Sequence, residues 1–123
     1  MSRAARSVLV FGVYLLVLGP TLAIAPNVVA RLVGVPETTE PWLRLVGVLA
    51  ANIGVYYVVA ARRDLQPVIA ASVPVRFALP VWLLLFVLLT GTDPAVMIFG
   101  GADIVGAVWT VLAIRADRRA GPS

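Results

Sequence analysis

Three residue types with reactive side chains are missing from this chain of 123 residues: cysteine, histidine and lysine. Without cysteine there is no disulfide, no thiol redox centre and no thiolate metal site. Without histidine there is no imidazole acid–base chemistry and no imidazole ligand for haem or zinc. Without lysine there is no side-chain amine to form a Schiff base. The sequence therefore predicts no metal or organic cofactor, and it argues against an enzyme.

Charged residues are also scarce. They make up 13% of the chain, whereas hydrophobic residues make up 61%. A soluble domain has about 25% charged and about 45–50% apolar residues. A soluble domain this small has a high surface-to-volume ratio and needs more polar residues to cover its surface. We therefore expect a single domain, residues 1–123, whose surface contacts the hydrocarbon of a lipid bilayer.

The net charge of +4 does not indicate a nucleic-acid partner. All ten basic residues are arginine, and most of them lie between the apolar stretches and at the ends of the chain. A nucleic-acid interface would gather them into one patch with interleaved aromatic residues. The arrangement is instead typical of membrane topology.

Four apolar stretches, residues 7–25, 43–61, 67–90 and 95–114, approach or exceed the roughly 20 residues that a helix needs to cross a bilayer. They are apolar on all sides, unlike the alternating strands of a membrane barrel. We expect an all-α fold, a four-transmembrane-helix antiparallel bundle. Asp93, in the turn before the last stretch, is a candidate cap for that helix. Residues 27–35 are too short to span and are predicted to lie along the membrane surface.

The arginines predict the orientation, because positive residues collect on the cytoplasmic side. With a cytoplasmic N-terminus, the outer segments contain only Arg31 and Arg44. The inner segments then contain seven arginines, which are Arg3, Arg6, Arg62, Arg63, Arg115, Arg118 and Arg119. We therefore expect both termini in the cytoplasm.

Two ionisable residues, Arg76 and Asp103, interrupt the third and fourth stretches. At 1.5 Å per residue, Arg76 lies roughly 13 Å from one membrane face and Asp103 roughly 12 Å from the other. Both are therefore near the midplane, where an isolated charge costs about 2.5–3.5 kcal/mol on insertion scales. Because a short turn joins these two helices, they should be antiparallel neighbours. The sequence predicts an Arg76–Asp103 ion pair.

Further polar residues are expected at similar depth and are candidate ligand-binding residues together with this pair. Asn52 and Tyr56 share a face of the second helix, and Thr110 lies close to Asp103 on the fourth. Two interpretations of the cluster remain open. The polar residues can fix which helix packs on which, as a structural device, or they can bind a ligand or an ion.

Several features occur in the order seen in DoxX-like and related four-helix membrane proteins of bacteria, and the chain resembles them. These features are the Pro-x-x-x-x-x-Leu-x-Gly segment from Pro26 to Gly34, Arg44 and Gly47 opening the second helix, Ala61-Arg62 closing it, Arg76, and Asp103. The resemblance covers most of the chain. It implies a four-helix fold in the bacterial cytoplasmic membrane, and an association of some relatives with quinone or sulfur redox complexes. It brings no catalytic set.

Three functions follow as hypotheses. The first is a non-enzymatic membrane protein that binds a small amphipathic ligand, or a membrane-protein partner, around Arg76 and Asp103. The second is a transporter or proton-conducting unit in which Asp103 titrates, which requires a homo-oligomer because four helices are few for a carrier. The third is an accessory subunit of a membrane redox complex. An enzyme ranks below these, because one midplane acid without histidine, cysteine or lysine gives no complete acid–base pair.

Overall fold

The computed structural model describes residues 1–39 and 41–121, and this part of the chain is helical almost throughout. Its elements are α1 (Arg3–Ile24), α2 (Pro26–Val33), α3 (Trp42–Arg62), α4 (Gln66–Thr90), the 3-10 helix η1 (Pro94–Val96) and α5 (Met97–Arg119). No strand occurs in the described residues, so the all-α prediction is confirmed. Helices α1, α3, α4 and α5 are each long and apolar enough to cross a membrane, as predicted.

The helix ends differ from the predicted bounds because local caps set them. Helix α1 begins at Arg3, where the Ser2 hydroxyl accepts a hydrogen bond from the Ala5 N–H at 3.0 Å. Asp93 acts as a cap, but of the 3-10 helix: its carboxylate accepts from the Ala95 N–H at 2.9 Å. Helix α5 therefore starts later than predicted, and it continues to Arg119 rather than ending at residue 114.

The short segment after α1 forms a separate helix. Pro26 occupies the first position of α2, where its missing N–H is no loss. Gly34 ends the helix in the left-handed conformation, at φ +82°. With eight residues, α2 is about 12 Å long and cannot cross a bilayer. Arg31 pairs with Glu37 at 3.1 Å in the loop that follows.

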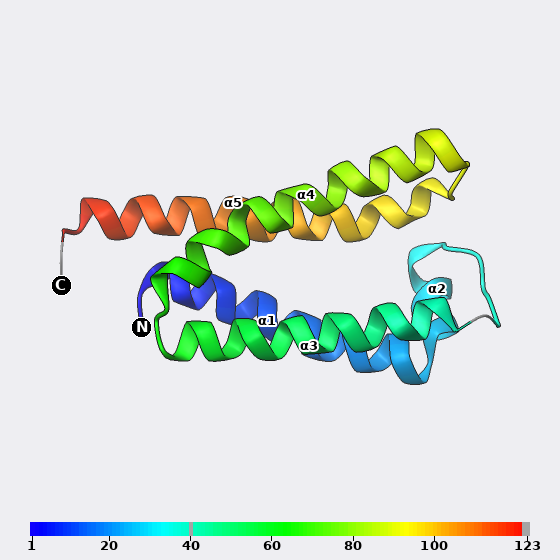
Figure 1. Cartoon of the computed structure of the whole chain (residues 1–123), viewed down its shortest axis with the longest axis horizontal. Coiled ribbons are helices and arrows are strands. Elements are labelled where there is room, and N and C mark those ends of the chain that lie inside the picture. Colours follow the sequence, from blue (N-terminus) through cyan, green and yellow to red (C-terminus); the bar gives the residue numbers. More distant parts are fainter. Residues whose placement is uncertain (40, 122–123) are drawn as a thin grey trace.

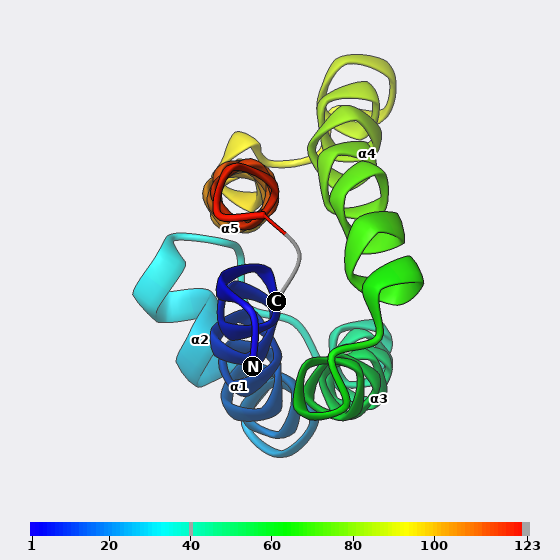
Figure 2. The same ribbon diagram turned by 90° about the vertical axis from the view of Figure 1, so that its left-hand side faces the viewer.

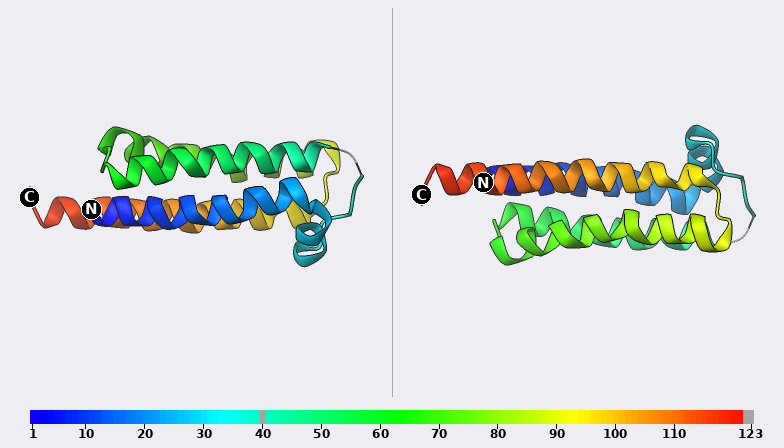
Figure 3. Two further views of the ribbon diagram at one scale, coloured as in Figure 1. Left: turned by 90° about the horizontal axis from the view of Figure 1, so that it is seen from below. Right: turned by 90° about the horizontal axis from the view of Figure 1, so that it is seen from above.

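Successive long helices run back and forth along the molecule, so that both chain ends lie near one end of it (Figure 1). The end-on view shows α1 between α3 and α5, with α4 beside α5 (Figure 2). Two further views show α1 aligned with α5 and α3 aligned with α4 (Figure 3). Helices α3 and α4, although joined by a short turn, diverge away from it (Figure 1). Helix α1 therefore packs against both α3 and α5.

Helices α1 and α3 approach each other closely because glycines line their contact. A Cβ atom built on Gly47 would lie 2.5 Å from the Gly19 carbonyl oxygen and 2.6 Å from the Ala23 nitrogen. Gly12 and Gly54 meet in the same way further along the two helices. Small residues of this kind let two apolar helices approach backbone to backbone. This contact fixes the rotation of α3 about its own axis.

The hydrophobic core lies around the first half of α1, where α3, α4 and α5 all reach it. Its buried members are Ala4, Ala5, Val8, Phe11, Leu15, Tyr57, Ala61, Ile69 and Ala113. Helix α4 contributes one narrow stripe, since its only buried residues are Ile69, Ser72, Arg76 and Pro80. These recur every three or four residues and so share one helix face. The same stripe brings a charged side chain into the interior.

Candidate functional site

Arg76 is the largest fully buried side chain among the described residues, with 1% of its surface exposed. Its guanidinium carbon lies 5.0 Å from the ring centre of Phe11 on α1 and 5.8 Å from that of Tyr57 on α3. Both distances are within the range of cation–π attraction. All four long helices therefore meet around this residue, because Thr110 of α5 contacts it as well.

The guanidinium makes three hydrogen bonds. Arg76 Nε donates to the Ser72 carbonyl oxygen at 3.2 Å, and Nη2 donates to Ser72 Oγ at 3.0 Å and to Thr110 Oγ1 at 2.7 Å. The Thr110 hydroxyl also lies 2.7 Å from Ser7 Oγ and 3.1 Å from the Gly106 carbonyl oxygen. One hydroxyl thus links α1, α4 and α5 at the centre of the molecule.

One end of the guanidinium is left without a partner. Arg76 Nη1 is buried and has no hydrogen bond to any described residue. It lies against Gly106, where an added Cβ atom would come within 3.1 Å of it. A buried charge costs several kcal/mol unless it is paired and hydrogen-bonded. The three hydrogen bonds and the two aromatic contacts of Arg76 offset part of this cost. The two N–H groups of Nη1 still have no hydrogen-bond acceptor among the described residues.

The predicted Arg76–Asp103 ion pair is wrong. No hydrogen bond or ion pair joins the two side chains, although they are close enough to interact electrostatically. The physical reason is the direction of helical side chains, which lean toward the N-terminus of their own helix. Because α4 and α5 run in opposite directions, Arg76 leans toward Ser72 and Thr110, and Asp103 leans the other way. Thr110 lies two turns from Asp103, or about 10 Å along α5.

Asn52 and Tyr56 do not join the cluster either. Both are exposed on α3, and 71% of the Tyr56 surface is accessible. The neighbouring residue, Tyr57, takes the interior position instead. Gly47 and Gly54 bring one face of α3 onto α1, and Tyr57 shares that face because it follows Gly54 by three residues. Of the five predicted site residues, the structure brings together Arg76 and Thr110.

The cluster also contains three residues that the sequence did not single out: Ser7, Phe11 and Tyr57. Ser7 and Phe11 are four residues apart and so share one face of α1. The only local signal of their role is the spacing itself: a small polar residue lies one turn before an aromatic residue, in an apolar stretch without charges. Nothing in the local sequence shows that this face meets Arg76.

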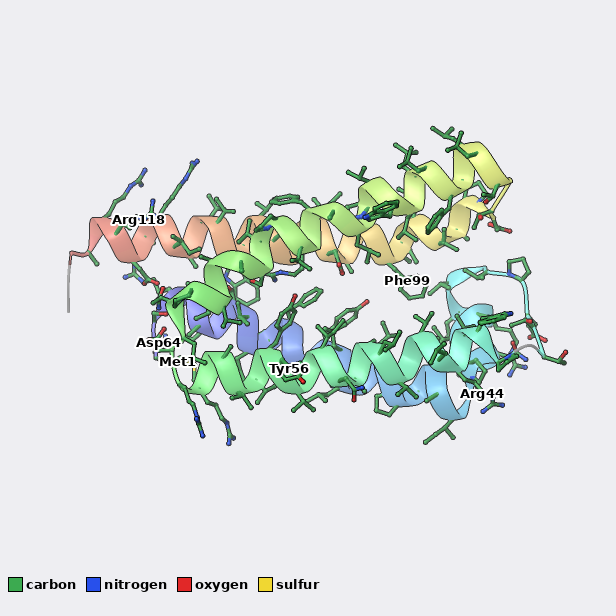
Figure 4. All side chains as sticks on the ribbon, viewed as in Figure 1. Met1, Arg44, Tyr56, Asp64, Phe99 and Arg118 are labelled. Carbon is green, nitrogen blue, oxygen red and sulfur yellow. The ribbon has the colours of Figure 1, made fainter. Side chains whose placement is uncertain are left out.

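A second polar network lies at the end of the molecule that holds the chain termini, where Asp64 and Arg118 are also found (Figure 4). Asp117 accepts hydrogen bonds from the backbone N–H groups of Arg3 at 3.2 Å and Ala4 at 3.1 Å. Asp64 accepts from the Ser2 N–H at 3.0 Å and from the Ser2 hydroxyl at 2.8 Å. Two carboxylates therefore satisfy the first N–H groups of α1, where the positive end of the helix dipole favours them.

The pKa of Asp64 is shifted by this network. Partial burial raises the pKa of the carboxyl group, but hydrogen bonds from Ser2 and Gln66 lower it by more, and the pKa is below its ordinary value.

At the opposite end of the molecule, Arg44 donates from Nη1 to the carbonyl oxygens of Ala23 at 2.9 Å and Ile24 at 3.1 Å. Arg44 thereby caps the C-terminus of α1, where a positive charge is favoured.

Open hollows of about 490 and 500 Å³ lie at the end with the chain termini, and Arg76 lines neither of them. Within residues 1–39 and 41–121 there is no group of three acidic, histidine or cysteine side chains that could hold a metal ion. The buried cluster is thus defined by one cation and its hydroxyl and aromatic neighbours.

Comparisons of this chain with protein-family models, with curated proteins and with solved structures give no match. Its function is therefore inferred from the residues and contacts of the chain itself. Those contacts leave two features to explain: the apolar outer surface and the buried guanidinium.

Proposed function

We propose that the chain is a multi-pass protein of the bacterial cytoplasmic membrane, with α1, α3, α4 and α5 as an antiparallel transmembrane bundle. Support comes from the length and composition of these helices and from their exposed leucine, valine and isoleucine side chains. The arginines support cytoplasmic termini. Arg44 lies at one end of the molecule and Arg118 at the other (Figure 4). The end that holds Arg118 also holds the chain termini and contains more arginines, as is typical of a cytoplasmic end.

The orientation can be tested by cysteine labelling, since the chain contains no cysteine of its own. Ala120 and Thr39 are exposed residues from the two ends of the molecule. In bacterial cells with a permeable outer membrane, an impermeant maleimide should label Thr39→Cys, and it should label Ala120→Cys only after the inner membrane is disrupted. The reverse result would contradict the orientation, and equal labelling in intact cells would contradict membrane insertion.

We further propose that the protein is not an enzyme and that Arg76 binds a small amphipathic ligand through an anionic or carbonyl oxygen. The observation that carries this proposal is the buried guanidinium whose Nη1 has no hydrogen-bond partner among the described residues. An oxygen atom of the ligand would accept hydrogen bonds from the two free N–H groups of Nη1. The apolar tail of the ligand would lie among the hydrophobic side chains. Charge-assisted hydrogen bonds of this kind are about twice as strong as neutral ones.

The ligand proposal predicts a specific thermal stabilisation. The purified protein in detergent would be heated with octanoate, 2-octanone or octane, which share an apolar tail and differ in the oxygen group. We expect octanoate and 2-octanone to raise the melting temperature above the effect of octane. The effect of the oxygen group should disappear in Arg76→Leu and persist in Arg62→Leu, which removes an exposed arginine. Equal shifts in all three proteins would refute the site.

A second function, proton conduction by an oligomer, is favoured by one observation. Asp103 is the seventh residue of α5 and is partly buried, and its carboxylate has no hydrogen bond to any residue of the described chain. An intramembrane carboxyl group of this kind is typical of proton relays. Proton flux into liposomes should be lost in Asp103→Asn and retained in Asp93→Asn. Equal flux in both variants would remove this candidate.

The resemblance to DoxX-like proteins belongs to the same proposal. It is carried by the segment from Pro26 to Gly34, Arg44, Gly47, Ala61-Arg62, Arg76 and Asp103. It would make the chain an accessory subunit of a membrane redox complex. A partner subunit that copurifies in fixed ratio with the wild-type protein would support that role. Isolation of the chain alone from its native membrane would count against it.

A further inference from the structure

The hollow of about 490 Å³ lies between the start of α1 and the end of α5 and contains three arginines. Arg3 comes from α1, and the other lining residues are Leu112, Arg115, Ala116, Arg119 and Ala120 of α5. The α5 residues recur at intervals of three and four, so they form one continuous helix face. The hollow is thus cationic toward the C-terminus of α5 and apolar toward its middle, at Leu112.

The three guanidinium groups of this hollow have no partner within the described chain. None of them forms an ion pair or a side-chain hydrogen bond in residues 1–39 and 41–121. The nearest acid in the sequence, Asp117, does not line the hollow. Its carboxylate is occupied by the first N–H groups of α1. The lining of the hollow therefore contains three guanidinium groups and no carboxylate.

We propose that this hollow binds the phosphate of an anionic phospholipid, with the beginning of an acyl chain along Leu112 and Ala116. Arginine suits a phosphate because its planar guanidinium presents paired donors to two oxygens. The inference rests on the membrane insertion proposed above. With both termini in the cytoplasm, the hollow lies at the inner leaflet, whose anionic lipids attract basic segments next to the membrane.

The other hollow, of about 500 Å³, shows that charge at this end is not spread evenly. It is lined by Gln66, Ala70, Ile114, Asp117, Arg118 and Gly121. One arginine and one aspartate line it, so it carries no net charge. Lipid binding at the two hollows should therefore differ in headgroup selectivity although they have similar size.

The test compares two variants with the same change in charge. One replaces Arg3, Arg115 and Arg119 by glutamine, and the control replaces Arg6, Arg62 and Arg63, which are exposed at the same end and line neither hollow. Native mass spectrometry from detergent would measure retention of phosphatidylglycerol against phosphatidylcholine with identical acyl chains. Each basic group near an anionic surface contributes about fivefold in binding. We expect the preference for phosphatidylglycerol over phosphatidylcholine to be at least about tenfold smaller in the first variant than in the wild type. The control should keep the wild-type preference.

The possible results separate the alternatives. Equal loss in both variants would overturn the site, because net charge alone would then explain the preference. Displacement of the lipid by millimolar inorganic phosphate would overturn the role of the acyl chain. The single variant Arg119→Gln, with about a fivefold smaller preference expected, gives the same comparison if the triple variant fails to fold. Failure to float with liposomes would refute membrane insertion itself, whereas floating without lipid selectivity would refute only this inference.

Discussion

The hydrogen bond from Arg76 to Thr110 gives the sharpest test of how the buried guanidinium is held. Thr110→Val keeps the side-chain shape and removes the hydroxyl. Arg76 Nη2 would then lose its acceptor at 2.7 Å and keep only Ser72 Oγ at 3.0 Å, while Nη1 has no partner in the described structure. Hydrogen bonds to charged groups contribute about 1.5–3 kcal/mol, and side-chain bonds within membranes average about 0.6 kcal/mol. We expect a loss of about 1–2 kcal/mol in unfolding free energy.

The opposite result is expected when the cation itself is removed. In Arg76→Met, the hydroxyl of Ser72 still donates to the Ile69 carbonyl oxygen at 2.6 Å, and Thr110 still contacts Ser7. No polar group is left without a partner. Replacing a buried charge by an apolar side chain of similar size is often neutral or stabilising by about 1–4 kcal/mol. Arg76→Met should therefore unfold with a free energy equal to or above that of the wild type.

Combining the two changes turns these expectations into a double-mutant cycle. In the Arg76→Met background, Thr110→Val removes the contact with Ser7 and the hydrogen bond to the Gly106 carbonyl oxygen, and it should cost about 0.5 kcal/mol. The coupling energy between Arg76 and Thr110 should then be about 1 kcal/mol. Reversible unfolding in mixed micelles, followed by tryptophan fluorescence, gives all four free energies. Additivity within about 0.3–0.5 kcal/mol would refute the inferred contact.

Three further predictions concern the helix contacts and caps. Gly47→Ala should destabilise the fold by about 1–3 kcal/mol, because the added Cβ atom would lie 2.5 Å from a carbonyl oxygen of α1. The control is Gly101→Ala, whose added Cβ atom would have no neighbour within 4 Å. It should be neutral or slightly stabilising in the same unfolding assay. Because the folded-state pKa of Asp64 lies below its ordinary value of 3.8, the stability it contributes is present above pH 3.8 and is lost as the pH falls through the folded value. The difference in unfolding free energy between wild type and Asp64→Asn should therefore be constant near neutral pH and shrink in acid; a constant difference down to pH 2 would contradict the network. Arg44→Leu should lower the unfolding free energy by about 0.5 kcal/mol and should speed amide hydrogen exchange only at the C-terminal end of α1. An equal acceleration of exchange along the whole of α1 would contradict the cap.

The helices themselves followed from local properties of the chain. Apolar runs of the necessary length, separated by short polar segments, predicted α1, α3, α4 and α5, because a helix satisfies its backbone groups within its own segment. The same local reasoning placed Arg76 in the interior, since an intramembrane charge faces the bundle rather than lipid. The short helix α2 was anticipated only as an apolar segment too short to span. The exact helix ends were less well predicted, because they depend on caps such as Ser2 and Asp93.

The surroundings of Arg76 were decided by the tertiary structure. Glycine contacts between α1 and α3 set the rotation of α3, which turns Tyr57 inward and leaves Tyr56 outside. The lean of helical side chains then separates Arg76 from Asp103, since the two helices run in opposite directions. Sequence spacing gives the depth of a residue along its helix, but it gives neither the rotation of that helix nor the direction of a long side chain. Those two quantities determine which groups the buried guanidinium meets.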